Sequence, residues 1–213
     1  MSPSNQPDPQ ELLGHLNRLR EAVGDRQQFR GYSGTARLAG GLAALATAGV
    51  LASPRVPATP LAHLLGWGVL LMIGGAVNYL ALLRWFLYSP DAGRKLFNLR
   101  PAIDALPPLA AGGILSAGAV LHGHADLLFG IWMCCYGAAQ CAYRRNLPPA
   151  SYAVGIYYLA AGAACLAWPG LEFTNPWPMG LIFFAGESVG GAIFLIDNYR
   201  ADQMRQKGDV RER

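Results

Sequence analysis

The chain has 213 residues, of which 53% are hydrophobic and only 14% are charged, and its formal net charge is +4. Soluble domains carry roughly 25% charged residues. The deficit, together with 26 glycines, is typical of helices in hydrocarbon, where charge is costly and glycine is common. The composition therefore excludes an ordinary soluble domain and favours an integral membrane protein.

Residues 1–34 are predicted to form a cytoplasmic segment that contains a short amphipathic helix, over about residues 9–29. Its apolar side chains recur at helical spacings of four, three and four residues. They are Leu12, Leu16, Leu19 and Val23. Such a stripe either lies on the inner surface of the membrane or docks on a protein partner.

Residues 35–198 are predicted to form a transmembrane domain of six helices. A helix needs about 20 residues to cross a hydrocarbon core of roughly 30 Å, and irregular backbone cannot face lipid. Proline and glycine clusters separate the apolar stretches, as turns between helices do. The stretches are Ala36–Ala52, Leu61–Leu87, Ile103–Leu121, Leu127–Tyr143, Tyr152–Trp168 and Met179–Ile196.

The distribution of positive charge predicts the orientation of these spans. If the N-terminus is cytoplasmic, every Lys and Arg except Arg55 falls on the inner side, including those of a basic tail at residues 199–213. The positive-inside rule then favours an inner-membrane protein with both termini in the cytoplasm. Basic residues next to spans meet anionic inner-leaflet lipids, so no nucleic-acid partner is predicted.

Four short motifs resemble those of a group of uncharacterised bacterial six-span membrane proteins that have no assigned function. The motifs lie before the first and third spans and inside the fourth and sixth. They are Phe29–Gly34, Gly93–Lys95, Tyr136–Ala139 and Gly186–Gly191. The resemblance implies a six-span bacterial membrane protein but no substrate, cofactor or catalytic residue.

Glu187 is the main candidate for a functional residue, because it falls near the middle of the last apolar stretch. An unpaired carboxylate there costs at least a few kcal/mol, so Glu187 must be protonated, paired or facing water. Gly186 and Gly190 beside it allow a neighbouring helix to come close. Glu187 is then either a proton or cation site, or a protonated carboxyl that is hydrogen-bonded between helices for packing.

Other polar residues in the apolar stretches are candidates for the same interior. They are Asn78, Tyr157, Tyr158, Gln140 and Ser116. Intramembrane amides and hydroxyls usually bond across helices for about 1 kcal/mol, so for each of them alone a structural role is favoured.

At the predicted inner boundary, Arg84 either pairs with Asp104 or extends towards lipid phosphates. On the outer side, His122, His124 and Asp126 are too few for a metal site, which needs about four ligands, and no metal is predicted. The four cysteines lie in apolar runs without the CxxC spacing of a zinc or redox site.

The chain has no Walker loop, GxSxG, HExxH or dinucleotide fingerprint, so neither an enzyme nor a cofactor is predicted. The favoured function is a small proton-linked transporter or channel-like protein with a polar interior around Glu187. The alternative is a regulatory or accessory subunit that binds a cytoplasmic or membrane partner through its N-terminal helix and basic inner face. Small-residue steps such as Gly40-xxx-Ala44 suit either internal packing or a homo-oligomer.

Overall fold

The computed structural model describes residues 13–14, 34–88, 100–142 and 148–211. Over these ranges the backbone is helical with short connections, and no strand occurs among them. The predicted all-α class is therefore confirmed for the described part of the chain. The predicted amphipathic helix at about residues 9–29 falls almost entirely outside it.

Each of the six apolar stretches coincides with one α-helix of the described chain. The helices are α2 (Gly34–Leu51), α3 (Pro60–Tyr88), α4 (Arg100–Leu121), α5 (Leu128–Ala142), α6 (Ser151–Ala167) and α7 (Trp177–Arg211), and a short 3-10 helix, η3 (Ala125–Leu127), precedes α5. Four of them are long and apolar enough to cross a membrane, namely α2, α3, α4 and α7, whereas α5 and α6 are shorter.

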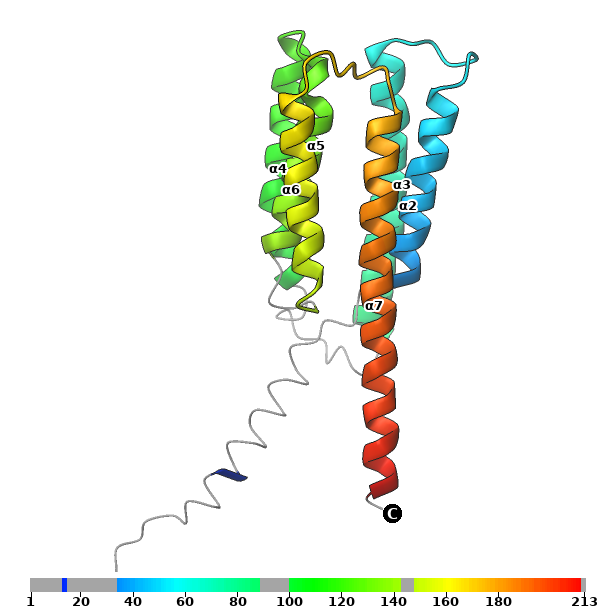
Figure 1. The fold of residues 1–213 in the computed structure, drawn as a ribbon, viewed down its shortest axis with the longest axis vertical. Helices are drawn as coiled ribbons and strands as arrows, with labels where there is room; N and C mark the ends of the chain where they lie inside the picture. The colour runs from blue at the N-terminus through cyan, green and yellow to red at the C-terminus, as the bar shows by residue number, and fades with distance from the viewer. Residues whose placement is uncertain (1–12, 15–33, 89–99, 143–147, 212–213) are drawn as a thin grey trace, which may run out of the picture.

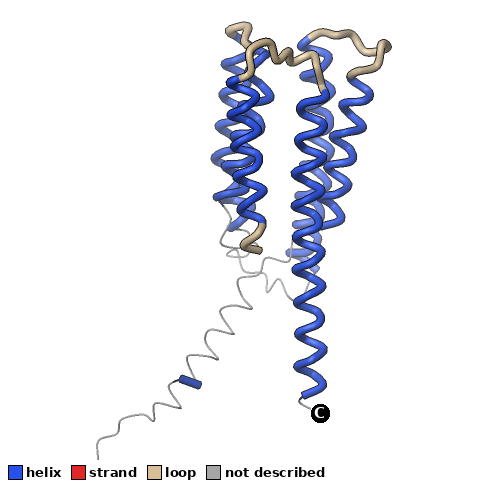
Figure 2. Tube along the Cα trace, in the orientation of Figure 1, coloured by secondary structure: helices blue, strands red, loops and turns tan. Residues whose placement is uncertain are grey.

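The helices stand side by side in two groups of three, with α2, α3 and α7 in one and α4, α5 and α6 in the other (Figure 1). The described loops lie at the ends of the helices (Figure 2). The α2–α3, α4–α5 and α6–α7 connections share the upper end in these views, and the C-terminus lies at the lower end. The α7 helix continues through residue 198, where the predicted domain boundary lay, and projects below the others.

Close contact between helices depends on facing glycines. On α5 and α6, Gly130 lies opposite Gly162 and Gly137 opposite Gly155, so the glycines of each helix are two turns apart. A Cβ atom on Gly137 would lie 2.8 Å from the Gly155 carbonyl oxygen, and one on Gly162 would lie 2.9 Å from that of Gly130. Only residues without a side chain let the two backbones approach this closely.

The same device joins α2 to α7, although they are the first and last helices of the bundle. A Cβ atom on Gly34 would lie 2.6 Å from the Gly191 carbonyl oxygen, and one on Gly180 would lie 2.5 Å from the Cβ of Ala48. This contact brings the beginning of the described bundle next to residues about 150 positions later in the sequence.

The outward faces of the helices are strongly apolar. Leu71 and Met72 on α3 are 72% and 73% exposed, and Ile114 on α4 is 73% exposed. Large exposed apolar surfaces are rare on soluble monomers. The arrangement, with apolar side chains outside, is compatible with a membrane protein.

Candidate functional site

A buried ion pair between α2 and α7 forms the centre of the candidate site. Arg37, one turn into α2, donates from Nε to Oε2 of Glu187 at 2.9 Å and from Nη2 to Oε1 at 3.0 Å. The two side chains are only 9% and 8% exposed. Two parallel N–H···O bonds of this kind fix the orientation of both groups as well as their distance.

Two tyrosines from the other helix group complete the hydrogen bonding of the carboxylate. The hydroxyls of Tyr136 on α5 and Tyr158 on α6 donate to Oε1 of Glu187 at 2.9 and 3.0 Å. Their rings pack edge to face, with centroids 4.9 Å apart. Tyr158 is fully buried, and its hydroxyl finds its nearer acceptor in Glu187 and a second one in the Phe183 carbonyl oxygen at 3.4 Å.

Gln140 and Phe194 hold the guanidinium of Arg37 from two further directions. Nη1 of Arg37 donates to Oε1 of Gln140 at 3.4 Å, and Cζ lies 5.7 Å from the centre of the Phe194 ring. Both neighbours are buried. We use the name charged cluster for Arg37, Tyr136, Gln140, Tyr158 and Glu187, which come from α2, α5, α6 and α7.

The glycines on either side of Glu187 make room for side chains of the charged cluster. A Cβ atom on Gly186 would lie 2.5 Å from the Tyr158 hydroxyl oxygen, and one on Gly190 would lie 2.8 Å from Cζ of Arg37. The sequence predicted that this glycine step lets a neighbouring helix come close. In the structure the two glycines also leave space for the side chains of Tyr158 and Arg37.

The cluster explains how a carboxyl group is tolerated in the buried interior of the bundle. Moving isolated charges out of water is prohibitive, and a buried pair is tolerated only with good geometry and further hydrogen bonds. Arg37 is permanently charged and Glu187 neutralises it, while the two tyrosines satisfy the carboxylate. Glu187 was predicted to be protonated, paired or facing water, and in the structure it is paired.

Of the other predicted interior residues, Gln140 joins the cluster and Tyr157 does not. The Tyr157 hydroxyl donates to the Ile182 carbonyl oxygen at 3.1 Å and the residue is partly exposed. Its neighbour Tyr158 takes the place at Glu187. The side chain of Asn78 lies outside the described part of the chain, although its backbone belongs to α3.

Ser116 has a structural role. Its hydroxyl donates to the Gly112 carbonyl oxygen at 2.6 Å and accepts from Nε1 of Trp132 at 2.8 Å.

The predicted pairing of Arg84 with Asp104 is not found. Both residues are exposed, and no ion pair joins them among the described contacts. Asp104 lies within α4, which begins before Pro107 and Pro108.

Sequence reasoning did not identify Arg37 or Tyr136 as partners of Glu187. Arg37 was counted only as one of the inner basic residues. A usable signal existed, because Arg37 and Arg84 are the two basic residues inside the predicted apolar stretches. A buried acid requires a base, which made both arginines candidates.

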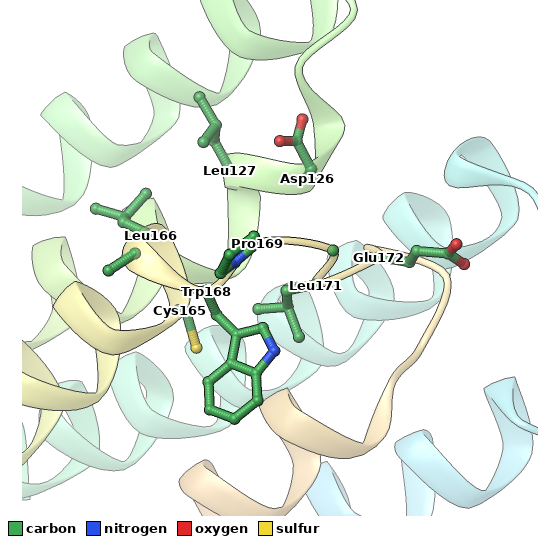
Figure 3. Close-up of a pocket in the computed structure, with 10 residues that line it drawn as sticks. Asp126, Leu127, Cys165, Leu166, Trp168, Pro169, Leu171 and Glu172 are labelled. Carbon is green, nitrogen blue, oxygen red and sulfur yellow. The ribbon is translucent and has the colours of Figure 1, made fainter.

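A pocket of about 460 Å³ opens at the other end of the bundle, between η3 and the loop after α6 (Figure 3). Asp126, Trp168 and Glu172 are among the residues around it, and Glu187 is not. No group of three His, Cys, Asp or Glu side chains that could hold a metal ion occurs within the described ranges.

Comparisons of the chain with protein-family models, with curated proteins and with solved structures found no match. The resemblance to uncharacterised bacterial six-span proteins therefore stays a prediction. The described chain is thus a helical bundle in which four helices are long and apolar enough to cross a membrane. A buried ion pair joins its helices α2 and α7.

Proposed function

We propose that the chain is a six-span protein of the inner membrane with both termini cytoplasmic, and that it works as a small proton-linked transporter or channel-like protein. The position of α5 and α6 beside the four longer helices (Figure 1) supports six crossings. The shared end of the three described interhelical loops supports an even number of spans. Exposed Arg84 and Arg200 at the lower end suit anionic inner-leaflet lipids.

The single observation that carries the functional proposal is the charged cluster. Ionisable residues at membrane depth are costly, and they commonly mark ion pathways and proton relays. Here four helices from both groups converge on one carboxylate. A change in the charge of Glu187 therefore acts at the contact between the two helix groups.

The chemistry of the pair provides a simple coupling mechanism. A proton on Glu187 removes the negative charge that neutralises Arg37 and weakens the hydrogen bonds from both tyrosines. Arg37 cannot release its own proton, so in the protonated state the buried cation no longer has the negative charge of Glu187 beside it. That state favours a rearrangement of α2 and α7 against α5 and α6, which is the two-state element that transport requires.

The position of the cluster along the helices suits exchange of protons with the inner side. Arg37 lies three residues after the lower end of α2, about 4.5 Å along the axis at 1.5 Å per residue. Glu187 lies ten residues after the upper end of α7, about 15 Å along its axis. We propose that protons reach the cluster from the inner side, because Arg37 lies nearer the lower end of α2 than its upper end.

Proton flux into proteoliposomes that contain a pH-sensitive dye tests this function. Glu187→Gln keeps the shape of the side chain but cannot carry a proton, and we expect it to reduce the flux at least about tenfold, as loss of a proton-transfer group does. Glu172→Gln, in the exposed upper loop, is the matched control and should retain the flux. Undiminished flux in Glu187→Gln contradicts the proposal.

One observation favours the alternative, a regulatory or accessory subunit. The α7 helix continues for 11 residues beyond Arg200 and projects from the bundle (Figure 1), where a soluble partner can reach it. Deletion of residues 1–30 distinguishes the two functions. A transporter should keep its flux, whereas an accessory subunit that binds through its N-terminal helix should lose its partner in a pull-down.

A further inference from the structure

The donors of the charged cluster form a cradle around a carboxylate that another helix supplies. Arg37 on α2, Tyr136 on α5 and Tyr158 on α6 all direct N–H or O–H groups at the two oxygens of Glu187, which comes from α7. The cradle and its occupant therefore belong to different elements.

The donors are also held by contacts that do not involve Glu187. Gln140 and the Phe194 ring position Arg37. The Phe183 ring lies 5.2 Å from the Tyr136 ring and 5.0 Å from the Tyr158 ring. These contacts, two of which come from rings of α7, hold the donors in addition to their bonds with Glu187.

We propose that this cradle is a binding site for a small carboxylate anion, and that Glu187 occupies the seat of that anion in the described state. The bidentate approach of Arg37 matches a planar carboxylate. The two tyrosine hydroxyls add neutral donors to one of its oxygens. The role of the ligand as a transported substrate rests on the proposed function, whereas its binding does not.

The exchange balances in charge and in protons. Glu187 takes up one proton and becomes neutral, and its carboxyl group leaves the guanidinium. One external carboxylate then forms the same hydrogen bonds to Arg37, Tyr136 and Tyr158, and the site regains the charge that it has with ionised Glu187. One proton and one anion are therefore bound together, which makes the coupled movement electroneutral.

Chemical rescue in the full-length protein tests the binding site directly. Glu187→Ala empties the seat and removes the negative charge of Glu187 from beside Arg37. We expect formate, and acetate less strongly, to raise the midpoint of thermal unfolding of this variant in detergent by about 5 °C near saturation. Chloride at equal ionic strength should raise it much less, because it cannot form the bidentate bonds.

Two further variants keep this test decisive. The double variant Arg37→Gln/Glu187→Ala lacks the guanidinium and should show no formate-dependent shift. Glu187→Gln retains the volume of the side chain and should show a smaller shift of the same sign. If Glu187→Ala folds only when formate is present during extraction, that recovery is itself the rescue.

The outcomes separate this inference from the proposed function. Formate rescue without proton flux in the wild type supports the anion site and contradicts transport. Proton flux that depends on Glu187, with no carboxylate-specific rescue in either single variant, supports transport and overturns the anion site. Equal stabilisation by chloride and formate also overturns it, because the cradle would then select anions by charge and not by the shape of a carboxylate.

Discussion

The two ends of the bundle are joined by opposite kinds of chemistry. At the upper end, rings of α3, α5 and the α6–α7 loop pack into what we call the aromatic cluster, which consists of His63, Trp67, Phe129, Trp132 and Phe173. The Phe129 and Phe173 ring centroids are 4.9 Å apart, and those of Trp132 and Phe173 are 5.6 Å apart. Towards the lower end, the charged cluster joins α2 and α7 to α5 and α6.

Both clusters connect the two helix groups, but they respond differently to a change of conditions. In lipid, helices associate through close packing and interhelical hydrogen bonds, because the surrounding chains are as apolar as the side chains. The aromatic cluster depends on close packing of its rings. The charged cluster depends on the charge of Glu187. We therefore expect the contacts between the helix groups at the upper end to stay the same when the charge of Glu187 changes, and those at the lower end to change. We call them the fixed end and the switchable end.

The largest expected effect is that of breaking the ion pair from one side. Arg37→Gln leaves Glu187 buried without its cation, and loss of one partner of a buried pair costs about 3–5 kcal/mol. We expect a loss of that size in the free energy of unfolding, measured by denaturant titration in detergent. A loss below about 1 kcal/mol, the value typical of exposed pairs, would show that the pair is not buried.

Truncation in the aromatic cluster should cost stability without changing function. Phe129 is fully buried, and Phe129→Ala is expected to cost about 3 kcal/mol through lost contacts and the cavity that remains. Proton flux per folded molecule should stay at the wild-type level, because the charged cluster is untouched. A selective loss of flux in the folded variant would contradict the division between a fixed and a switchable end.

The helices could be predicted from the sequence because lipid permits few alternatives. Six apolar stretches became six helices, and Glu187 stood out because a lone acid in an apolar stretch demands a partner. The partner itself could not be singled out. Arg37 lies near a helix end, where a basic residue also fits the positive-inside rule, and nothing in the sequence states that α2 packs against α7.

The choice between two adjacent tyrosines shows a further limit. Neighbouring helical residues point about 100° apart, so only one of Tyr157 and Tyr158 can face Glu187. Sequence spacing does not reveal which face of α6 meets α7. That face is decided by the glycine contacts with α5, which fix the rotation of α6.

Tyr136, which contacts Glu187, and Tyr157, which does not, provide a matched pair of variants with a smaller effect. Tyr136→Phe removes one donor to a buried carboxylate, and hydrogen bonds to charged groups contribute about 1.5–3 kcal/mol. Tyr157→Phe removes a bond to a backbone carbonyl on a partly exposed side chain and should cost about 0.5–1 kcal/mol. Unfolding titrations of both variants check the order, and the reverse order would place the site at Tyr157.

The smallest effect concerns the space beside Arg37. Gly190→Ala would place a Cβ atom 2.8 Å from Cζ of Arg37. Overpacking costs about 1–3 kcal/mol, partly offset by the better helix propensity of alanine, so we expect a net loss of about 1 kcal/mol. Gly49→Ala on α2, with no atom within 4 Å of its Cβ position, is the control and should be neutral or slightly stabilising.

A double-mutant cycle tests the central claim, that Arg37 and Glu187 form one buried unit between the first and last helices of the described bundle. The free energy of unfolding is compared for the wild type, Arg37→Gln, Glu187→Gln and the double variant. Two neutral glutamines leave no uncompensated charge, so the double variant should lose less than the sum of the single losses, by about 1–3 kcal/mol. Losses that add within about 0.5 kcal/mol would mean that the two residues do not interact, which would contradict the account.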